Sequence, residues 1–181
     1  MKKKQSGGTG SAPLYEVLIV DGFNLIHRDP ESAALLTAGR LYPARRRLIE
    51  KLERVTGAIA RRIHVVFDGR GEGGAEEDFD GSAVEITYSP SGTTADLVIE
   101  RLVRKSPKPE SLLVVTSDRM ERDSVDASGA RHMGCGEFLE WIQKVSEDLN
   151  RAARQAANKT PANPLGEWFP EVSIRNRKSD S

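Results

Sequence analysis

Cysteine, aromatic residues, long apolar runs and net charge are all scarce in this sequence, and each shortage excludes something. The 181 residues include one cysteine, which leaves no internal disulfide framework and no cysteine-based zinc site. No stretch approaches the roughly 18 apolar residues that a membrane span needs. The 27 basic and 27 acidic side chains cancel, so the chain is not a globally basic nucleic-acid binder. Any binding to a polyanion therefore depends on a local patch or on a metal.

The length and the changes of composition along the chain predict one domain with a tail at each end. Residues 1–13 are rich in Gly and Ser after three lysines, without the apolar segment of an export signal, and we expect a disordered leader. We expect residues 14–158 to form the folded domain and residues 159–181 a C-terminal tail that is partly disordered. The missing export signal and the lone thiol predict a cytoplasmic protein without a membrane partner.

Strands and helices are predicted to alternate along the domain. Runs rich in β-branched residues predict strands over 15–20, 63–67, 84–88, 112–116 and 130–133. Helices are predicted over 43–62, 94–105, 119–128 and 137–158, and a Gly-rich acidic loop over 69–81. This order indicates an α/β fold, a three-layer α/β/α sandwich around a mainly parallel central sheet.

Acidic residues follow three of the predicted strands: Asp21, Asp68 and Asp118. The carboxyl ends of parallel strands share one edge of the sheet, where open α/β folds bind ligands. Asp96 falls in the first turn of the helix after the third strand, and Glu100 lies four residues further on the same helix face. Carboxylates that converge repel one another unless a cation offsets their charge, and oxygen ligands suit Mg²⁺ or Mn²⁺. Such a metal activates water and stabilises charge in phosphodiester hydrolysis.

Each of these acids also has a structural alternative. Asp21 and Asp68 stand before glycines as in turns, Asp96 and Asp118 fit N-terminal helix caps, and Glu100 is four residues before Arg104. Their joint position at one edge, rather than any single residue, favours the metal site.

Several short motifs, in order, resemble those of one nuclease family. They are Val20-Asp21-Gly22-Phe23-Asn24-Leu25-Ile26, Val65-Val66-Phe67-Asp68, Thr94-Ala95-Asp96 and Thr116-Ser117-Asp118. The series looks like that of the NYN-domain ribonucleases, in their YacP-like branch. The resemblance implies a PIN-like fold and an endoribonuclease activity that depends on Mg²⁺ or Mn²⁺. It also implies RNA as partner, since studied members of the branch are ribosome-associated enzymes that cut mRNA.

The resemblance carries roles over to individual positions. Asp21 and Asp96 match the catalytic aspartates and Asp118 the acidic position after the fourth strand, so these three are expected to hold the metal and to be catalytic. Four further residues are expected to lie beside the ligands: Asn24, Asp68, Glu100 and Ser117. The chain departs from the family pattern at Phe23, where tyrosine is usual, and at Thr93, where glutamate is usual.

Basic residues concentrate in and just before the helix that is predicted over residues 43–62. Residues 40–62 contain eight basic and two acidic side chains, which gives a face able to contact phosphates. Arg45 and Arg46 are the predicted RNA-binding residues, and Ala44-Arg45, with Leu48-Ile49 after it, also resembles a motif of the family. The alternative is a solvated face with ion pairs inside the helix. An alternative function also remains open, a non-catalytic RNA- or ribosome-binding module with the same fold.

Overall fold

The structure is a computed structural model that describes residues 14–69 and 83–159. Its elements, in chain order, are β1 (Tyr15–Asp21), α1 (Gly22–Arg28), α2 (Pro30–Thr37), α3 (Leu41–Glu53), β2 (Ala60–Phe67), β3 (Val84–Tyr88), α4 (Ala95–Lys105), the 3-10 helix η1 (Pro109–Ser111), β4 (Leu112–Val115), α5 (Arg119–Ala127), β5 (Arg131–Met133) and α6 (Cys135–Lys159). The expected leader, the tail from residue 160 and nearly all of the acidic loop lie outside the described residues.

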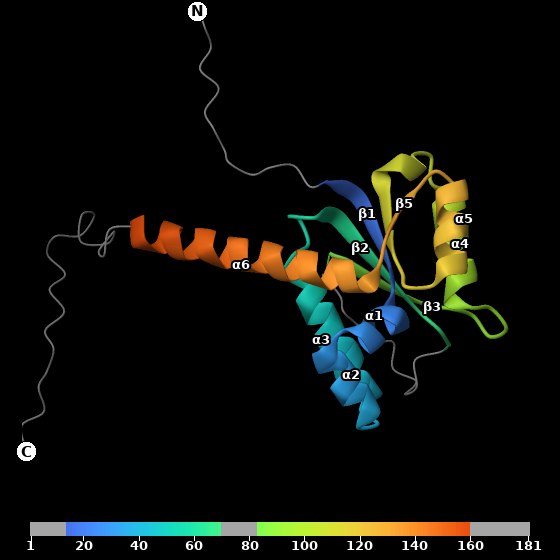
Figure 1. Cartoon of the computed structure of the whole chain (residues 1–181), viewed down its shortest axis with the longest axis horizontal. Helices are drawn as coiled ribbons and strands as arrows, with labels where there is room; N and C mark the ends of the chain where they lie inside the picture. Colours follow the sequence, from blue (N-terminus) through green and yellow to red (C-terminus); the bar gives the residue numbers. More distant parts are fainter. Residues whose placement is uncertain (1–13, 70–82, 160–181) are drawn as a thin grey trace, which may run out of the picture. The chain divides into compact units, whose positions relative to one another are not determined.

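The five strands form one sheet in the order β3-β2-β1-β4-β5, and every neighbouring pair is parallel. In Figure 1, α4 and α5 lie on one side of this sheet, and α1 and α3 lie on the other. The predicted α/β fold with a mainly parallel central sheet is therefore confirmed. β1 is central because its continuous apolar run, VLIV, can be buried on both faces.

Alternate residues of each strand serve two separate hydrophobic cores. Leu18 and Val20 of β1 pack in one core, together with residues of α1, α3 and α6 such as Leu48 and Phe138. Ile19 faces the other way and packs against α4 and α5. Side chains of a strand alternate between its faces, so a single buried strand supports both helical layers.

Two parts of the predicted secondary structure are wrong. The helix expected over 43–62 ends at Glu53, because the chain turns through Gly57, whose φ is +85°, and enters β2 at Ala60. Val55 and Ile59, which continue the helical spacing, are buried from this turn instead. The helices α1 and α2 were not predicted. α1 has 7 residues, which is too few to show a helical repeat of apolar side chains. α2 has 8 residues, and its one buried residue is the polar Ser32, so it has no buried apolar face.

The chain divides into two units, Met1–Ser146 and Glu147–Ser181. The sheet and every site described below belong to the first unit. The described part of the second is the end of α6, where residues 147–158 are exposed. None of the helices within the described ranges is long and apolar enough to cross a membrane.

Candidate metal and catalytic site

The strand order places a natural crevice beside the carboxyl end of β1. From β1 the chain continues to β2 on one side, while β4 lies on the other side. Helices that follow strands on the two sides of such a switch point diverge and leave a crevice where ligands bind. β1 ends at Asp21, and the helices that begin near this end of the sheet are α1, α4 and α5.

Asp21 is held in place by the first turn of α1. Its side chain is 4% exposed and caps the helix, with Oδ1 accepting a hydrogen bond from the backbone N–H of Asn24 at 2.9 Å. The side-chain amide of Asn24 donates to Oδ2 at 2.5 Å. The next residue has to be glycine, because a Cβ at Gly22 would lie 2.2 Å from Cε1 of Phe67. Asn24 therefore orients both oxygens of Asp21, and each keeps a further lone pair for a ligand.

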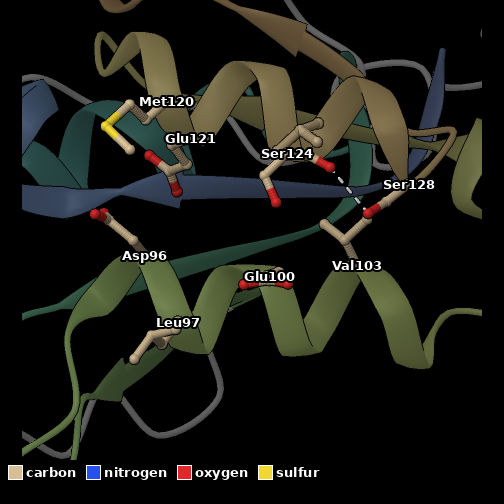
Figure 2. Close-up of a pocket in the computed structure, with 9 residues that line it drawn as sticks. Asp96, Leu97, Glu100, Val103, Met120, Glu121, Ser124 and Ser128 are labelled. Atoms are coloured by element: carbon tan, nitrogen blue, oxygen red, sulfur yellow. Dashed lines mark hydrogen bonds between the residues drawn. The ribbon is translucent and has the colours of Figure 1, made fainter.

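Asp96 stands in the first turn of α4. The N-cap of this helix is Thr94, whose Oγ1 accepts from the N–H of Leu97 at 3.4 Å. Asp68, at the end of β2, accepts from the N–H of Ala95 at 2.6 Å and so ties the start of α4 to the sheet. Asp96 is itself exposed, and Figure 2 shows its carboxylate pointing across the cavity toward α5.

Glu121 completes the cluster from the first turn of α5. Asp118 caps this helix, and its Oδ1 accepts from the N–H groups of Met120 at 2.7 Å and Glu121 at 3.3 Å. Glu121 is 6% exposed, and its carboxylate faces that of Asp96 in Figure 2. One ligand oxygen from each of Asp21, Asp96 and Glu121 lies within 4.8 Å of the others. We call these three residues the acidic trio.

A small cavity opens from the acidic trio between α4 and α5. It has a volume of about 160 Å³, and its lining includes Asp96, Glu121 and Glu100. Two exposed apolar side chains, Leu97 and Met120, line the same cavity at its end near the trio (Figure 2). The carboxylates of Asp96 and Glu121 thus border a cavity that is open to solvent.

The pKa of each member of the trio is raised, as expected for like charges in a partly dry site. Burial, and then the charges of Asp21, Asp96 and Asp118, raise the pKa of Glu121 from 4.5 to about 7. The Thr116 hydroxyl is the main group that opposes this increase in the pKa of Glu121. Burial is also the main cause that raises the pKa of Asp21, against the hydrogen bonds from Asn24 that lower it. For Asp96, which is only partly shielded from water, the causes that raise the pKa are this partial burial and then the charges of Asp21 and Asp118.

The residues present fit a divalent cation. Within residues 14–69 and 83–159, neither carboxylate oxygen of Glu121 has a hydrogen-bond partner of good geometry, although both are buried. A buried carboxylate without a partner is costly, and a cation among three carboxylates removes that cost. An all-oxygen donor set that is open to water on one side is the kind that Mg²⁺ and Mn²⁺ accept.

The other predicted site residues surround the trio with defined structural contacts. Asp118 is near enough to raise the pKa of Asp96 and of Glu121, while one of its oxygens caps α5. Glu100 pairs with Arg104 at 2.9 Å. Ser117 is exposed and lies at the start of a second cleft beside Asn24.

The structure places the two predicted RNA-binding arginines differently from expectation. Arg45 is 3% exposed, and its guanidinium lies 5.1 Å from the ring centres of Phe67 and Tyr88 and 5.5 Å from that of Phe23. A buried cation over three rings holds α3 against β2 and β3 and offers no surface to a phosphate. Arg46 is exposed but pairs with Glu50 at 3.0 Å, as the alternative of an ion-paired helix face expects.

The sequence analysis missed Glu121. The signal was present, because Asp118 and Glu121 have the spacing of a capping box, an N-cap acid followed three residues later by glutamate. That pattern marks the start of α5 and also places Glu121 in the first turn of a helix at the carboxyl edge. Asp96 occupies the equivalent first turn of α4, which is why the two face each other.

Comparisons with known proteins agree with this architecture. A protein of Bacillus subtilis (strain 168) with the name "Uncharacterized protein YacP" is 28% identical over 151 residues, which cover 83% of this chain and 88% of that protein. A crystal structure of Rae1 (YacP) from Bacillus subtilis has a TM-score of 0.68 at 28% identity and covers 86% of this chain and 89% of its own. A mutant of that protein gives a TM-score of 0.64 at 27% identity, covering 81% and 86%. The family model of the YacP-like NYN domain matches residues 18–174, so the chain belongs to this family, whose members are generally nucleases.

Proposed function

We propose that the protein is a metal-dependent endoribonuclease that hydrolyses phosphodiester bonds of RNA, with mRNA on the ribosome as its substrate. The observation that supports this most is the acidic trio, in which Asp21, Asp96 and Glu121 come within 4.8 Å at the switch point of the sheet. Membership of a family of nucleases supports the same reaction class. The preference for mRNA and for the ribosome follows the family resemblance alone.

The acidic trio would hold Mg²⁺ or Mn²⁺. When bound, such an ion lowers the pKa of water and stabilises negative charge on phosphate oxygens. Asn24 fixes the rotamer of Asp21 through two hydrogen bonds, so this ligand needs no reorganisation. Asp118 and Asp68 fix the first turns of α5 and α4, which present the other two carboxylates. Without a cation, Glu121 is about half protonated near pH 7, because its pKa is about 7.

Cleavage within a strand, rather than at its end, is supported by the surroundings of the trio. The cavity in Figure 2 opens on the side of Asp96 and Glu121. A second, wider cleft opens on the side of Asn24, whose amide binds Asp21. An RNA strand that crosses the trio can continue into both openings, so no strand terminus is required at the reacting phosphate.

The test is cleavage of labelled RNA, free and ribosome-bound, with Mn²⁺, with Mg²⁺ and with EDTA. We expect cleavage with either metal and none with EDTA. Asp21→Asn and Asp96→Asn should each lower the rate by at least 100-fold, the scale of losing a ligand or a preorganised charge in such sites. Asp123→Asn is a matched control, because Asp123 is an exposed acid on α5, two residues from Glu121.

Circular dichroism and urea unfolding would show that the variants remain folded. Unchanged cleavage in both Asp21→Asn and Asp96→Asn would refute the proposal. Tight RNA or ribosome binding without cleavage under any metal condition would favour the alternative, a non-catalytic binding module of the same fold.

A further inference from the structure

A second cleft lies at the carboxyl edge, next to the acidic trio, and its chemistry is different. It has a volume of about 590 Å³ and is bordered by the end of α1, the start of α5 and the first turn of α6. Three arginines line it: Arg28 from α1, and Arg119 and Arg122 from α5. Glu137 is the one carboxylate that residues 14–69 and 83–159 contribute to its lining, so this surface of the cleft is cationic.

These three arginines form no ion pairs within the part of the chain that the structure describes. Arg122 is oriented by the protein backbone, since its Nε donates to the carbonyl of Asp118 at 3.2 Å and its Nη2 to that of Ser117 at 3.4 Å. Arg28 lies beside the start of α6, with Nε 3.6 Å from where a Cβ of Gly136 would stand. The three arginines thus share one cleft, and the guanidinium of Arg122 is held in a fixed direction there, unlike freely solvated surface arginines.

The cleft continues directly from the trio. Asn24 lines it and also donates its amide to Asp21. On α5, Glu121 faces the cavity of Figure 2, while Arg119 and Arg122, two positions before and one after it, face the cationic cleft. One helical turn thus separates a carboxylate surface from a guanidinium surface.

A polyanionic strand needs such a surface, because the trio itself repels phosphate. Guanidinium groups suit phosphate oxygens by charge and by their planar fork of donors. The three arginines of α3 are engaged elsewhere, since Arg45 is buried, Arg46 pairs with Glu50 and Arg47 pairs with Glu31. The arginines that line the cleft of Asn24, the residue whose amide binds Asp21, come from α1 and α5.

We propose that Arg28, Arg119 and Arg122 bind the backbone phosphates of single-stranded RNA beside the phosphate that is cleaved. This rests on the proposed function, because it names the surface by which the same site takes its substrate. The arginines position the strand, and the trio acts on the phosphate between this cleft and the cavity of Figure 2.

The test compares two double variants of the full chain that lose the same charge. Arg28→Gln with Arg119→Gln removes two cations from the cleft but leaves Arg122, which contacts the start of α5. The matched control, Arg61→Gln with Arg62→Gln, removes two exposed arginines near the beginning of β2, at the opposite edge of the sheet. Binding of a labelled 12-nucleotide RNA is measured by fluorescence anisotropy in EDTA at several salt concentrations.

For single strands, each lost phosphate contact reduces the magnitude of the slope of log K against log salt by about 0.7. Near 0.1 M salt, this corresponds to a loss of about fivefold in affinity. We therefore expect the cleft variant to bind on the order of 25-fold more weakly, with a slope smaller by about 1.4. The control should stay within about twofold of the parent, because its charges are distant and exposed. Equal effects in both variants, an unchanged cleft variant, or no measurable binding by the parent would overturn the proposal.

Cleavage in Mn²⁺ separates this proposal from the nuclease proposal. If cleavage depends on Asp21 while KM is insensitive to the cleft variant, the cleft proposal fails alone. If the cleft variant loses RNA affinity but the parent cleaves no RNA with any metal, the cleft binds RNA and the nuclease proposal fails. Thermal unfolding of both double variants checks that they are folded.

Discussion

Replacing Glu121 by glutamine should stabilise the cation-free protein, and by an amount that depends on pH. Glutamine has the shape of the neutral carboxylic acid and carries no charge. Glu121 is 6% exposed, its pKa is raised from 4.5 to about 7, and within the described chain its oxygens have no hydrogen-bond partner of good geometry. The ionised form is therefore a cost that folding has to overcome.

The sign follows from proton binding in the two states. Below pH 4.5 Glu121 is protonated both in the folded and in the unfolded chain, so it adds no pH dependence. Between pH 4.5 and about 7 the unfolded chain has lost this proton and the folded chain keeps it, so stability falls as the pH rises. Above pH 7 the full cost is reached, about 3 kcal/mol at 1.36 kcal/mol per pKa unit.

The assay is urea unfolding of the parent and of Glu121→Gln in EDTA, at pH 5 and at pH 8. We expect a small difference in the free energy of unfolding at pH 5 and a stabilisation of the variant by about 3 kcal/mol at pH 8. Addition of Mn²⁺ at pH 8 should stabilise the parent more than the variant, because the variant lacks one ligand. A difference between the two proteins that does not change from pH 5 to pH 8 would refute the reasoning.

Two further substitutions test how the fold supports the site. Gly22→Ala places a Cβ 2.2 Å from the buried ring of Phe67 and should lower the free energy of unfolding by about 1–3 kcal/mol, as measured in urea. Gly134→Ala is the control, because a Cβ there meets open space and should have little effect on stability. Equal effects of the two substitutions would contradict this prediction. Burial alone would raise the pKa of Asp29. Hydrogen bonds instead lower this pKa below its ordinary value, and the bond from Lys51 has the largest effect among them. Lys51→Met leaves this buried carboxylate without its cation and should cost about 3 kcal/mol at pH 7, a loss that disappears as the pH falls and Asp29 is protonated. Urea unfolding at pH 7 and pH 3 measures this, and an equal cost at both pH values would contradict it.

The strands and the carboxyl-edge position of the acids were predictable from the sequence. Runs such as VLIV and LLVV leave little alternative to buried parallel strands, and β3 has the predicted bounds, Val84–Tyr88. Once the strands are parallel, Asp21 and the first turn of α4 necessarily lie at one edge. Asp21 and Asp96 converge because of the sheet topology, and this topology can be predicted from the order of strands and helices in the sequence.

What could not be predicted depends on turns and on side-chain direction. A helical spacing through Val55 and Ile59 does not reveal that Gly57 adopts a positive φ and ends the helix early. Arg45 belongs to a basic run, and only the three-dimensional packing of three rings around it shows that it is internal. Glu121 resembled an ordinary first-turn acid, because its role depends on the direction in which α5 presents it.

α5 carries a carboxylate of the acidic trio and two arginines of the cationic cleft within four consecutive residues, Arg119 to Arg122. A rigid helical turn cannot adjust one of these surfaces without moving the other. If the trio binds a cation and the cleft binds RNA, as proposed, the position of α5 affects both binding events. Thermodynamic reciprocity then requires that whatever factor the cation adds to RNA affinity, RNA adds to cation affinity. For the proposed nuclease, the concentration of the ion would then affect both the rate of cleavage and the lifetime of the complex with RNA.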